Sequence, residues 1–131
     1  MLIQPYCHRI DNEAETEVVF IDGEISHCMR KGPLLSLDRP IEKGPWREED
    51  MAASAPEPDM LMLARRVHDL AAARFGFSPL YARVDAVRDD DDRPVLMELE
   101  LVEPSLFLQY QQGSAARLAE ALVGRLESAT C

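Results

Sequence analysis

Apolar and polar residues alternate with a period of two between Leu80 and Val102, a pattern typical of β-strands with one buried face. In the first half, Ala82, Val84 and Ala86 share one side, and Arg83 and Asp85 share the other. In the second half, one side carries Val95, Met97, Leu99 and Leu101, and the other carries Leu96, Glu98, Glu100 and Val102. Four aspartates at 89–92 separate the halves, so we predict a hairpin over residues 79–103.

The register of this hairpin follows if its turn is centred between the last two aspartates. An even turn makes Asp85 face Glu98 and Arg83 face Glu100. Directly opposed like charges destabilise a sheet, so the facing acids call for a cation, and Arg83 is one. Clustered carboxylates without histidine or thiolate suit Mg²⁺ or Mn²⁺. The alternative is a solvated acidic face that holds no ligand.

A second hairpin is predicted in EVVFIDGEISHCMRK, where two β-rich runs flank Asp22-Gly23. This pair tolerates the positive φ angles of a two-residue type I′ turn. A turn of that length sets Phe20 opposite Ile25, Val18 opposite His27 and Glu15 opposite Arg30. Residues 1–31 are therefore expected to hold an N-terminal strand and this hairpin, which ends at Lys31.

The remaining segments predict one loop and two helices. Prolines and the polar run REED make 32–58 a loop. Apolar residues at helical spacing predict helices over 59–75 and 114–127. We therefore expect a single α+β domain over 1–131, with a mainly antiparallel sheet covered by two helices.

Composition narrows the class of partner. The 131 residues carry a net charge of -10, which repels phosphate backbones and disfavours a nucleic-acid partner. No apolar run approaches the length that spans a bilayer, and the N-terminus lacks the pattern of a signal peptide, so we expect a cytoplasmic protein without a membrane partner. The three cysteines have no metal-site spacing.

Several motifs resemble the C-terminal part of an ATP-grasp ligase. ARVD at 82–85, ELE at 98–100 and the following VEPSLFL resemble the ending of the branch that contains small-molecule carboxylate-amine ligases. Upstream, MLIQPY resembles the segment that runs along the adenine, and VVFIDGEISHCMRK resembles a hairpin of the same branch. The resemblance covers most of the chain apart from 34–58.

The resemblance implies a reaction and a set of site residues. In the superfamily, ATP converts a small-molecule carboxylate to an acyl phosphate, which an amine or a related nucleophile such as a thiol then attacks. By this likeness, Arg83 would contact the phosphates of the nucleotide or the acyl phosphate, with Lys31 as a weaker phosphate or substrate contact. The other implied contacts are Mg²⁺ (or Mn²⁺) at Asp85, Glu98 and Glu100, and the nucleotide at Gln4 and Tyr6.

Complete members of the superfamily carry further domains ahead of this region, including a lid. The resemblance therefore implies a partial ATP-grasp domain that needs a partner chain or a second copy to complete its cleft. Two other interpretations stay open. One is a non-catalytic truncated remnant that serves as a binding or interaction module, and the other is an acidic globular domain without a site.

Overall fold

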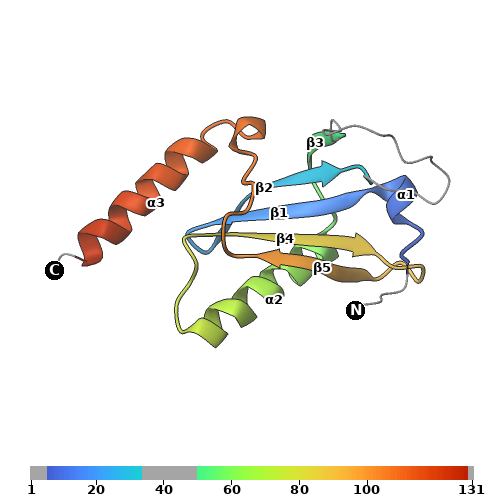
Figure 1. Cartoon of the computed structure of the whole chain (residues 1–131), viewed down its shortest axis with the longest axis horizontal. Helices are drawn as coiled ribbons and strands as arrows, with labels where there is room; N and C mark the ends of the chain where they lie inside the picture. The colour runs from blue at the N-terminus through green and yellow to red at the C-terminus, as the bar shows by residue number, and fades with distance from the viewer. Residues whose placement is uncertain (1–5, 34–49, 130–131) are drawn as a thin grey trace.

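The computed structural model describes residues 6–33 and 50–129, where five antiparallel strands form one sheet accompanied by three α-helices (Figure 1). The strands are β1 (Glu15–Ile21), β2 (Glu24–Lys31), β3 (Met51–Ser54), β4 (Tyr81–Arg88) and β5 (Pro94–Glu100), and the helices are α1 (Ile10–Glu13), α2 (Pro58–Phe75), α3 (Ser114–Ala129) and the 3₁₀ helix η1 (Leu108–Tyr110). The spatial order β3-β2-β1-β4-β5 makes β1 and β4 neighbours although they are distant in sequence. The predicted α+β class with a mainly antiparallel sheet is confirmed.

The β1–β2 turn is built as its two residues predict. Asp22 and Gly23 have φ angles of 52° and 81°, and Phe20 faces Ile25. Gly23 also lies so close to the hydroxyl of Ser78 that an added Cβ would come within 3.0 Å of it. Both the positive φ and this close approach favour glycine at the position.

Beyond this turn the predicted register is wrong by one residue. A β-bulge places an extra residue in β2 directly after the first pairs, so His27 faces Val19 rather than Val18. Glu15 consequently faces Lys31 instead of Arg30. Bulges shift every later pair by one, and turn chemistry alone does not reveal them.

In the β4–β5 hairpin the predicted pairs Asp85–Glu98 and Arg83–Glu100 are confirmed. The turn itself differs from the predicted even one, because Arg88 faces Pro94 and Asp92 takes a left-handed φ of 68°.

Asp85 faces Glu98 and its neighbour Ala86 faces Leu96, so β5 has one extra residue, a bulge, between these pairs. This bulge compensates for the odd turn and restores the expected register at the acids. It also pairs Leu96 with Ala86, on the side opposite the one predicted for this leucine. The register at Asp85 is therefore right although the predicted turn is not.

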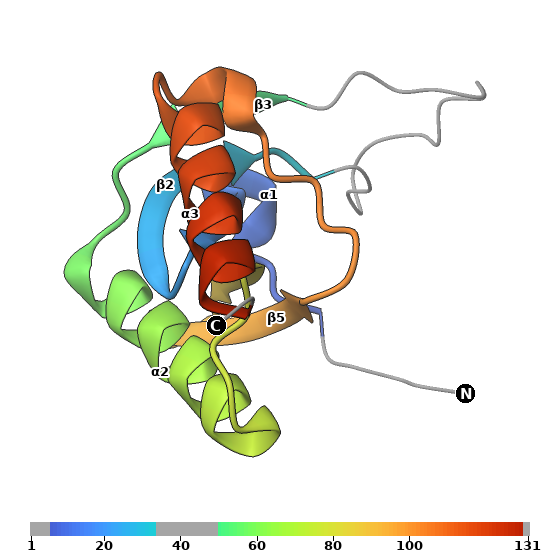
Figure 2. The ribbon, with the colours of Figure 1, turned by 90° about the vertical axis from the view of Figure 1, so that its left-hand side faces the viewer.

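One face of the sheet packs against α2, as Figure 2 shows. The core contains Val18, Phe20, Cys28, Ala64, Ala82 and Val84. Phe20 is fully buried, and its ring stacks on His68 of α2 with centroids 4.5 Å apart. Alternation along β1 and β4 then directs the intervening side chains to the opposite face.

The predicted loop over 32–58 is wrong at residues 51–54, which form the edge strand β3 and pair with β2. MAAS has little β-propensity, so the strand depends on the backbone partners that β2 offers at its open edge. The rest of the proline-rich stretch, 34–49, lies outside the described residues, as does 1–5, where an N-terminal strand was predicted. The short helix α1 immediately precedes β1.

Helix α3 lies beyond the end of the sheet that contains the β1–β2 turn (Figure 1). Arginines hold it there: Arg117 donates to the backbone carbonyls of Ile21 and Ile25, and Arg125 pairs with Asp22 at 2.7 Å. In the described ranges, no helix has the length and apolar character needed to cross a membrane.

Candidate functional site

The sheet face opposite α2 carries the charged residues, and we call it the site face: Glu15, Glu17, Lys31, Arg83, Asp85, Glu98 and Glu100. Pairing across three strands aligns them in rows. Glu17 of β1 faces Asp85 of β4, which faces Glu98 of β5. In the next row, Arg83 faces Glu100. Period-two alternation within each strand and the register between strands together position these groups.

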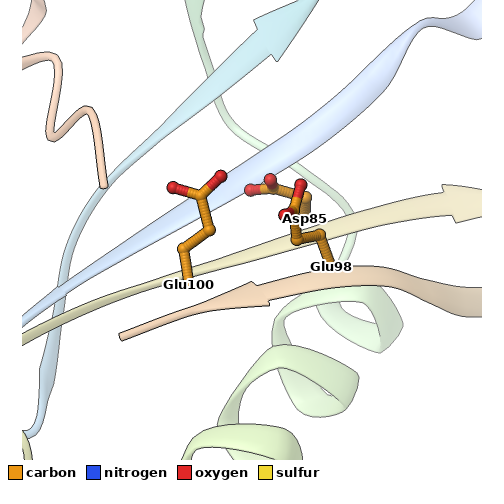
Figure 3. A group of neighbouring side chains, drawn as sticks. All are labelled: Asp85, Glu98 and Glu100. Atoms are coloured by element: carbon orange, nitrogen blue, oxygen red, sulfur yellow. The ribbon is translucent and has the colours of Figure 1, made fainter. Parts of the chain in front are cut away.

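Asp85, Glu98 and Glu100 form the carboxylate trio, and each offers an oxygen within 4.8 Å of the other two (Figure 3). Asp85 is 2% exposed, Glu100 is half-buried and Glu98 is exposed. Three carboxylate oxygens without nitrogen or sulfur donors suit a hard divalent cation such as Mg²⁺ or Mn²⁺. The trio therefore fits the metal that the sequence motifs imply.

Arg83 lies buried beside the trio. Its Nε and Nη2 donate to the two oxygens of Asp85 at 2.8 Å each, and Nη2 also donates to Glu100 at 2.7 Å. Burial lowers the pKa of Arg83, but the hydrogen bonds and negative charge of Asp85 outweigh that effect and raise it overall. A charged guanidinium is thus held where negative charge is concentrated.

The segment that follows β5 crosses the site face and fixes Arg83 from a second side (Figure 2). The backbone carbonyl of Ser105 accepts a hydrogen bond from Arg83, and the centroid of the Phe107 ring lies 5.6 Å from the guanidinium carbon Cζ. The carbonyl of Leu106 lies 2.8 Å from Nε2 of His27 on β2. The EPSLF motif therefore acts as a brace across the strands.

Of the predicted nucleotide contacts, the structure brings Lys31 to the site face, where its Nζ lies 3.8 Å from Glu17. Tyr6 lies just ahead of α1, and its hydroxyl donates to Asp11 at 2.9 Å. Gln4 lies outside the described residues. A cation at Arg83, a second at Lys31 and the oxygens of the trio together suit a phosphate group with an associated divalent cation.

Glu17 is a site residue that the sequence reasoning missed. It is fully buried, and neither carboxylate oxygen has a hydrogen-bond partner. Burial raises the pKa of its carboxyl to about 7, although the charge of Arg83 opposes the shift. The available signal was a glutamate inside an otherwise apolar strand, EVVFI, but its place beside Asp85 depends on the long-range β1–β4 pairing.

Glu17 should make the folded chain less stable as the pH rises. Its folded pKa of about 7 exceeds the ordinary glutamate value of 4.5, so the folded state binds this proton more tightly. The resulting stability is present below pH 4.5 and is lost as the pH rises through 7. At about 1.4 kcal/mol per unit of pKa difference, wild type should lose about 2 to 3 kcal/mol more than Glu17→Gln between pH 5 and pH 8 in urea denaturation. Equal losses in the two proteins would contradict a raised pKa, and the exposed Glu120→Gln should behave as wild type.

No protein-family model matches the chain. The cycloserine biosynthesis protein DcsG of Streptomyces lavendulae is 36% identical over 129 residues, which are 97% of this chain and 42% of that protein. The crystal structure of D-cycloserine synthetase DcsG superposes with a TM-score of 0.82 at 32% identity, over 94% of this chain and 41% of that one. The chain thus spans about two fifths of the length of these relatives.

More distant structures share the fold alone. The D-alanine--D-alanine ligase from Bacillus anthracis, complexed with ATP, has a TM-score of 0.55 at 15% identity and matches 89% of this chain and 40% of its own. The ATP-grasp ligase PsnB, complexed with a precursor variant, Mg and ADP, has a TM-score of 0.53 at 14% identity, over 86% and 33%. Together these similarities confirm that the chain has the fold of ATP-grasp ligases, as its motifs predicted, and its partial coverage of each relative is in keeping with the C-terminal portion that the motifs indicate.

Proposed function

We propose that the chain forms the Mg²⁺- and ATP-binding part of an ATP-dependent ligase that joins a small-molecule carboxylate to an amine or a thiol through an acyl phosphate. The observation that carries the proposal is the carboxylate trio beside buried Arg83, in a chain 36% identical to DcsG. A relative named as a synthetase and an ATP-bound ligase of the same fold support it.

The trio would hold the divalent cation in this proposal. Such a cation supplies neutralisation of phosphate charge and alignment for in-line transfer. Arg83 binds the negative oxygens of the nucleotide or of the acyl phosphate, because its guanidinium is buried, charged and braced by Ser105. Lys31 adds a second positive charge from β2. Gln4 and Tyr6 remain the proposed contacts of the nucleotide.

An acyl phosphate is destroyed by water, so catalysis requires a closed site. Glu98 is exposed and Glu100 is half-buried, so the described residues leave one side of the trio accessible. We propose that a partner chain or a second copy supplies the opposite wall and part of the substrate pocket. Binding of the nucleotide and the metal is the part of the reaction assigned to the present residues.

Calorimetry with Mg·ATP tests the proposal. Glu98→Gln is the informative change, because Glu98 is exposed and belongs to the trio, so the variant should fold as wild type does. Wild type should bind Mg·ATP at millimolar ligand, and Glu98→Gln should bind about tenfold or more weakly. The matched control Glu120→Gln changes an exposed glutamate of α3 and should bind as wild type. Unchanged binding by Glu98→Gln would refute the metal assignment.

A non-catalytic binding module is the second candidate. Exposed apolar residues on α3 favour it: Leu122, Val123 and Leu126. Large exposed apolar groups close together on one helix are typical of contact surfaces. This candidate predicts no heat with Mg·ATP in the same calorimetric experiment, together with concentration-dependent association in analytical ultracentrifugation.

A further inference from the structure

Arg83 engages two of the three acids that would hold a cation. Its fork occupies both oxygens of Asp85, and the same Nη2 reaches Glu100 at 2.7 Å. A divalent cation coordinated by these oxygens would share Asp85 with the two hydrogen bonds of the guanidinium and would be repelled by its charge. Movement of Arg83 away from that carboxylate would relieve the repulsion and leave both oxygens of Asp85 to the cation.

Glu17 is the acid placed to receive the guanidinium. Its Oε1 lies 4.0 Å from Nε of Arg83, just beyond hydrogen-bond distance. Neither of its oxygens has a hydrogen-bond partner, and the residue is fully buried. Glu17 also faces Asp85 on the adjacent strand, so the guanidinium of Arg83 lies within 4.0 Å of both acids.

The other groups around Glu17 are compatible with this exchange. Lys31 lies on the β2 side with its Nζ 3.8 Å away, beyond the range of a good hydrogen bond. Arg83 thus has acids on two sides, Asp85 with Glu100 on one and Glu17 on the other. A buried carboxylate with two unsatisfied oxygens is costly and calls for an explanation, and a second state in which the oxygens are used supplies one.

We propose that Glu17 is the alternative counter-ion of Arg83, which accepts the guanidinium when a divalent cation occupies the carboxylate trio. The proposal rests on the proposed metal site and goes beyond it by assigning a positioning role to a residue outside the trio. Glu17 favours the metal-loaded state because it offers Arg83 a buried partner there. In the metal-free state the same residue destabilises the fold.

A double-mutant cycle read by Mn²⁺ affinity tests this role on the full chain. Free Mn²⁺ is measured by electron paramagnetic resonance for wild type, Glu17→Gln, Arg83→Met and the double variant. Glu17→Gln should weaken Mn²⁺ binding about fivefold when Arg83 is present. Arg83→Met has no guanidinium that Glu17 could accept. In that background Glu17→Gln should therefore weaken Mn²⁺ binding by no more than about twofold.

Glu15→Gln is the matched control for a simple loss of charge. Glu15 lies on the same face of β1, two residues from Glu17, and faces Lys31 rather than Arg83. Its loss should change Mn²⁺ affinity by the same factor in both Arg83 backgrounds. An equal effect of Glu17→Gln in both backgrounds would show that Glu17 acts only through its charge and would overturn the exchange.

A direct readout of Arg83 covers the case in which Arg83→Met does not fold. The Nε–Hε resonance of Arg83 is followed by nitrogen-proton NMR while the chain is titrated with Mg²⁺. It should shift in wild type and shift to a different position in Glu17→Gln, where the charged acceptor is absent. A resonance that does not move at saturating Mg²⁺, or that ends at the same position in both proteins, would overturn the proposal.

The outcomes separate this inference from the metal site itself. If Glu98→Gln removes Mn²⁺ binding but the cycle shows no coupling between Glu17 and Arg83, the metal site stands and the exchange is wrong. If wild type binds no Mn²⁺ at millimolar concentration, both fail together. If Glu17→Gln weakens Mn²⁺ binding only when Arg83 is present, the result supports both the metal site and the exchange.

Discussion

Replacing Arg83 by alanine is expected to lower the free energy of unfolding by about 3 to 5 kcal/mol. The guanidinium is buried and satisfies both oxygens of Asp85, which is itself 2% exposed. Without Arg83, both Asp85 and Glu17 would be buried acids that have lost this nearby positive charge. Urea denaturation followed by circular dichroism at pH 7 measures the loss.

Arg93→Ala is the control within the same hairpin. Arg93 is largely exposed and pairs with Asp89 and Asp91 at the turn, so its removal should cost less than about 1 kcal/mol. If Mg²⁺ binds the trio, millimolar Mg²⁺ should recover part of the stability lost in Arg83→Ala, because it replaces the missing positive charge. A loss no larger than that of Arg93→Ala would contradict the role of Arg83 as the buried counter-ion.

Phe20→Ala is expected to cost about 3 to 5 kcal/mol of unfolding free energy. Phe20 is fully buried in the core between the sheet and α2, where it stacks on His68 and lies under the guanidinium of Arg65. Removing the ring leaves a cavity that the surrounding strands and helix cannot fill. Thermal and urea denaturation measure the effect.

Phe77→Ala provides the comparison for this prediction. Phe77 is 63% exposed after the end of α2, so its removal should change stability by less than about 1 kcal/mol. Similar losses in the two variants would mean that α2 is not packed tightly on the sheet. The same measurement would then question the face on which α2 is placed.

Local chemistry and alternation were enough to predict much of the site. Asp22-Gly23 specifies its own turn, and alternation from Ala82 onward places Arg83 and Asp85 on one face without knowledge of the neighbouring strands. The predicted pairing of Asp85 with Glu98 is present, but the prediction assumed an even turn, and the pairing depends on the bulge in β5 that offsets the odd one. Short-range patterns were therefore enough to predict which charged residues share one face of this hairpin.

Long-range pairing was not accessible in the same way. Glu17 joins the site only because β1 lies beside β4, more than sixty positions later in the chain. Likewise, β3 exists because β2 has an edge to pair with, not because MAAS favours a strand. The bulge in β2 moved His27 opposite Val19 through backbone geometry that no side-chain pattern announces.

The bulge in β5 separates the aspartate turn from the chemistry. It lies between the turn and the Asp85–Glu98 pair, so the pairs nearer the turn follow one register and those at the acids another. If the turn gained or lost one residue, the bulge could absorb the change in register, and the pairing of the acids would stay the same. The length of this turn can therefore vary without changing which functional groups face one another.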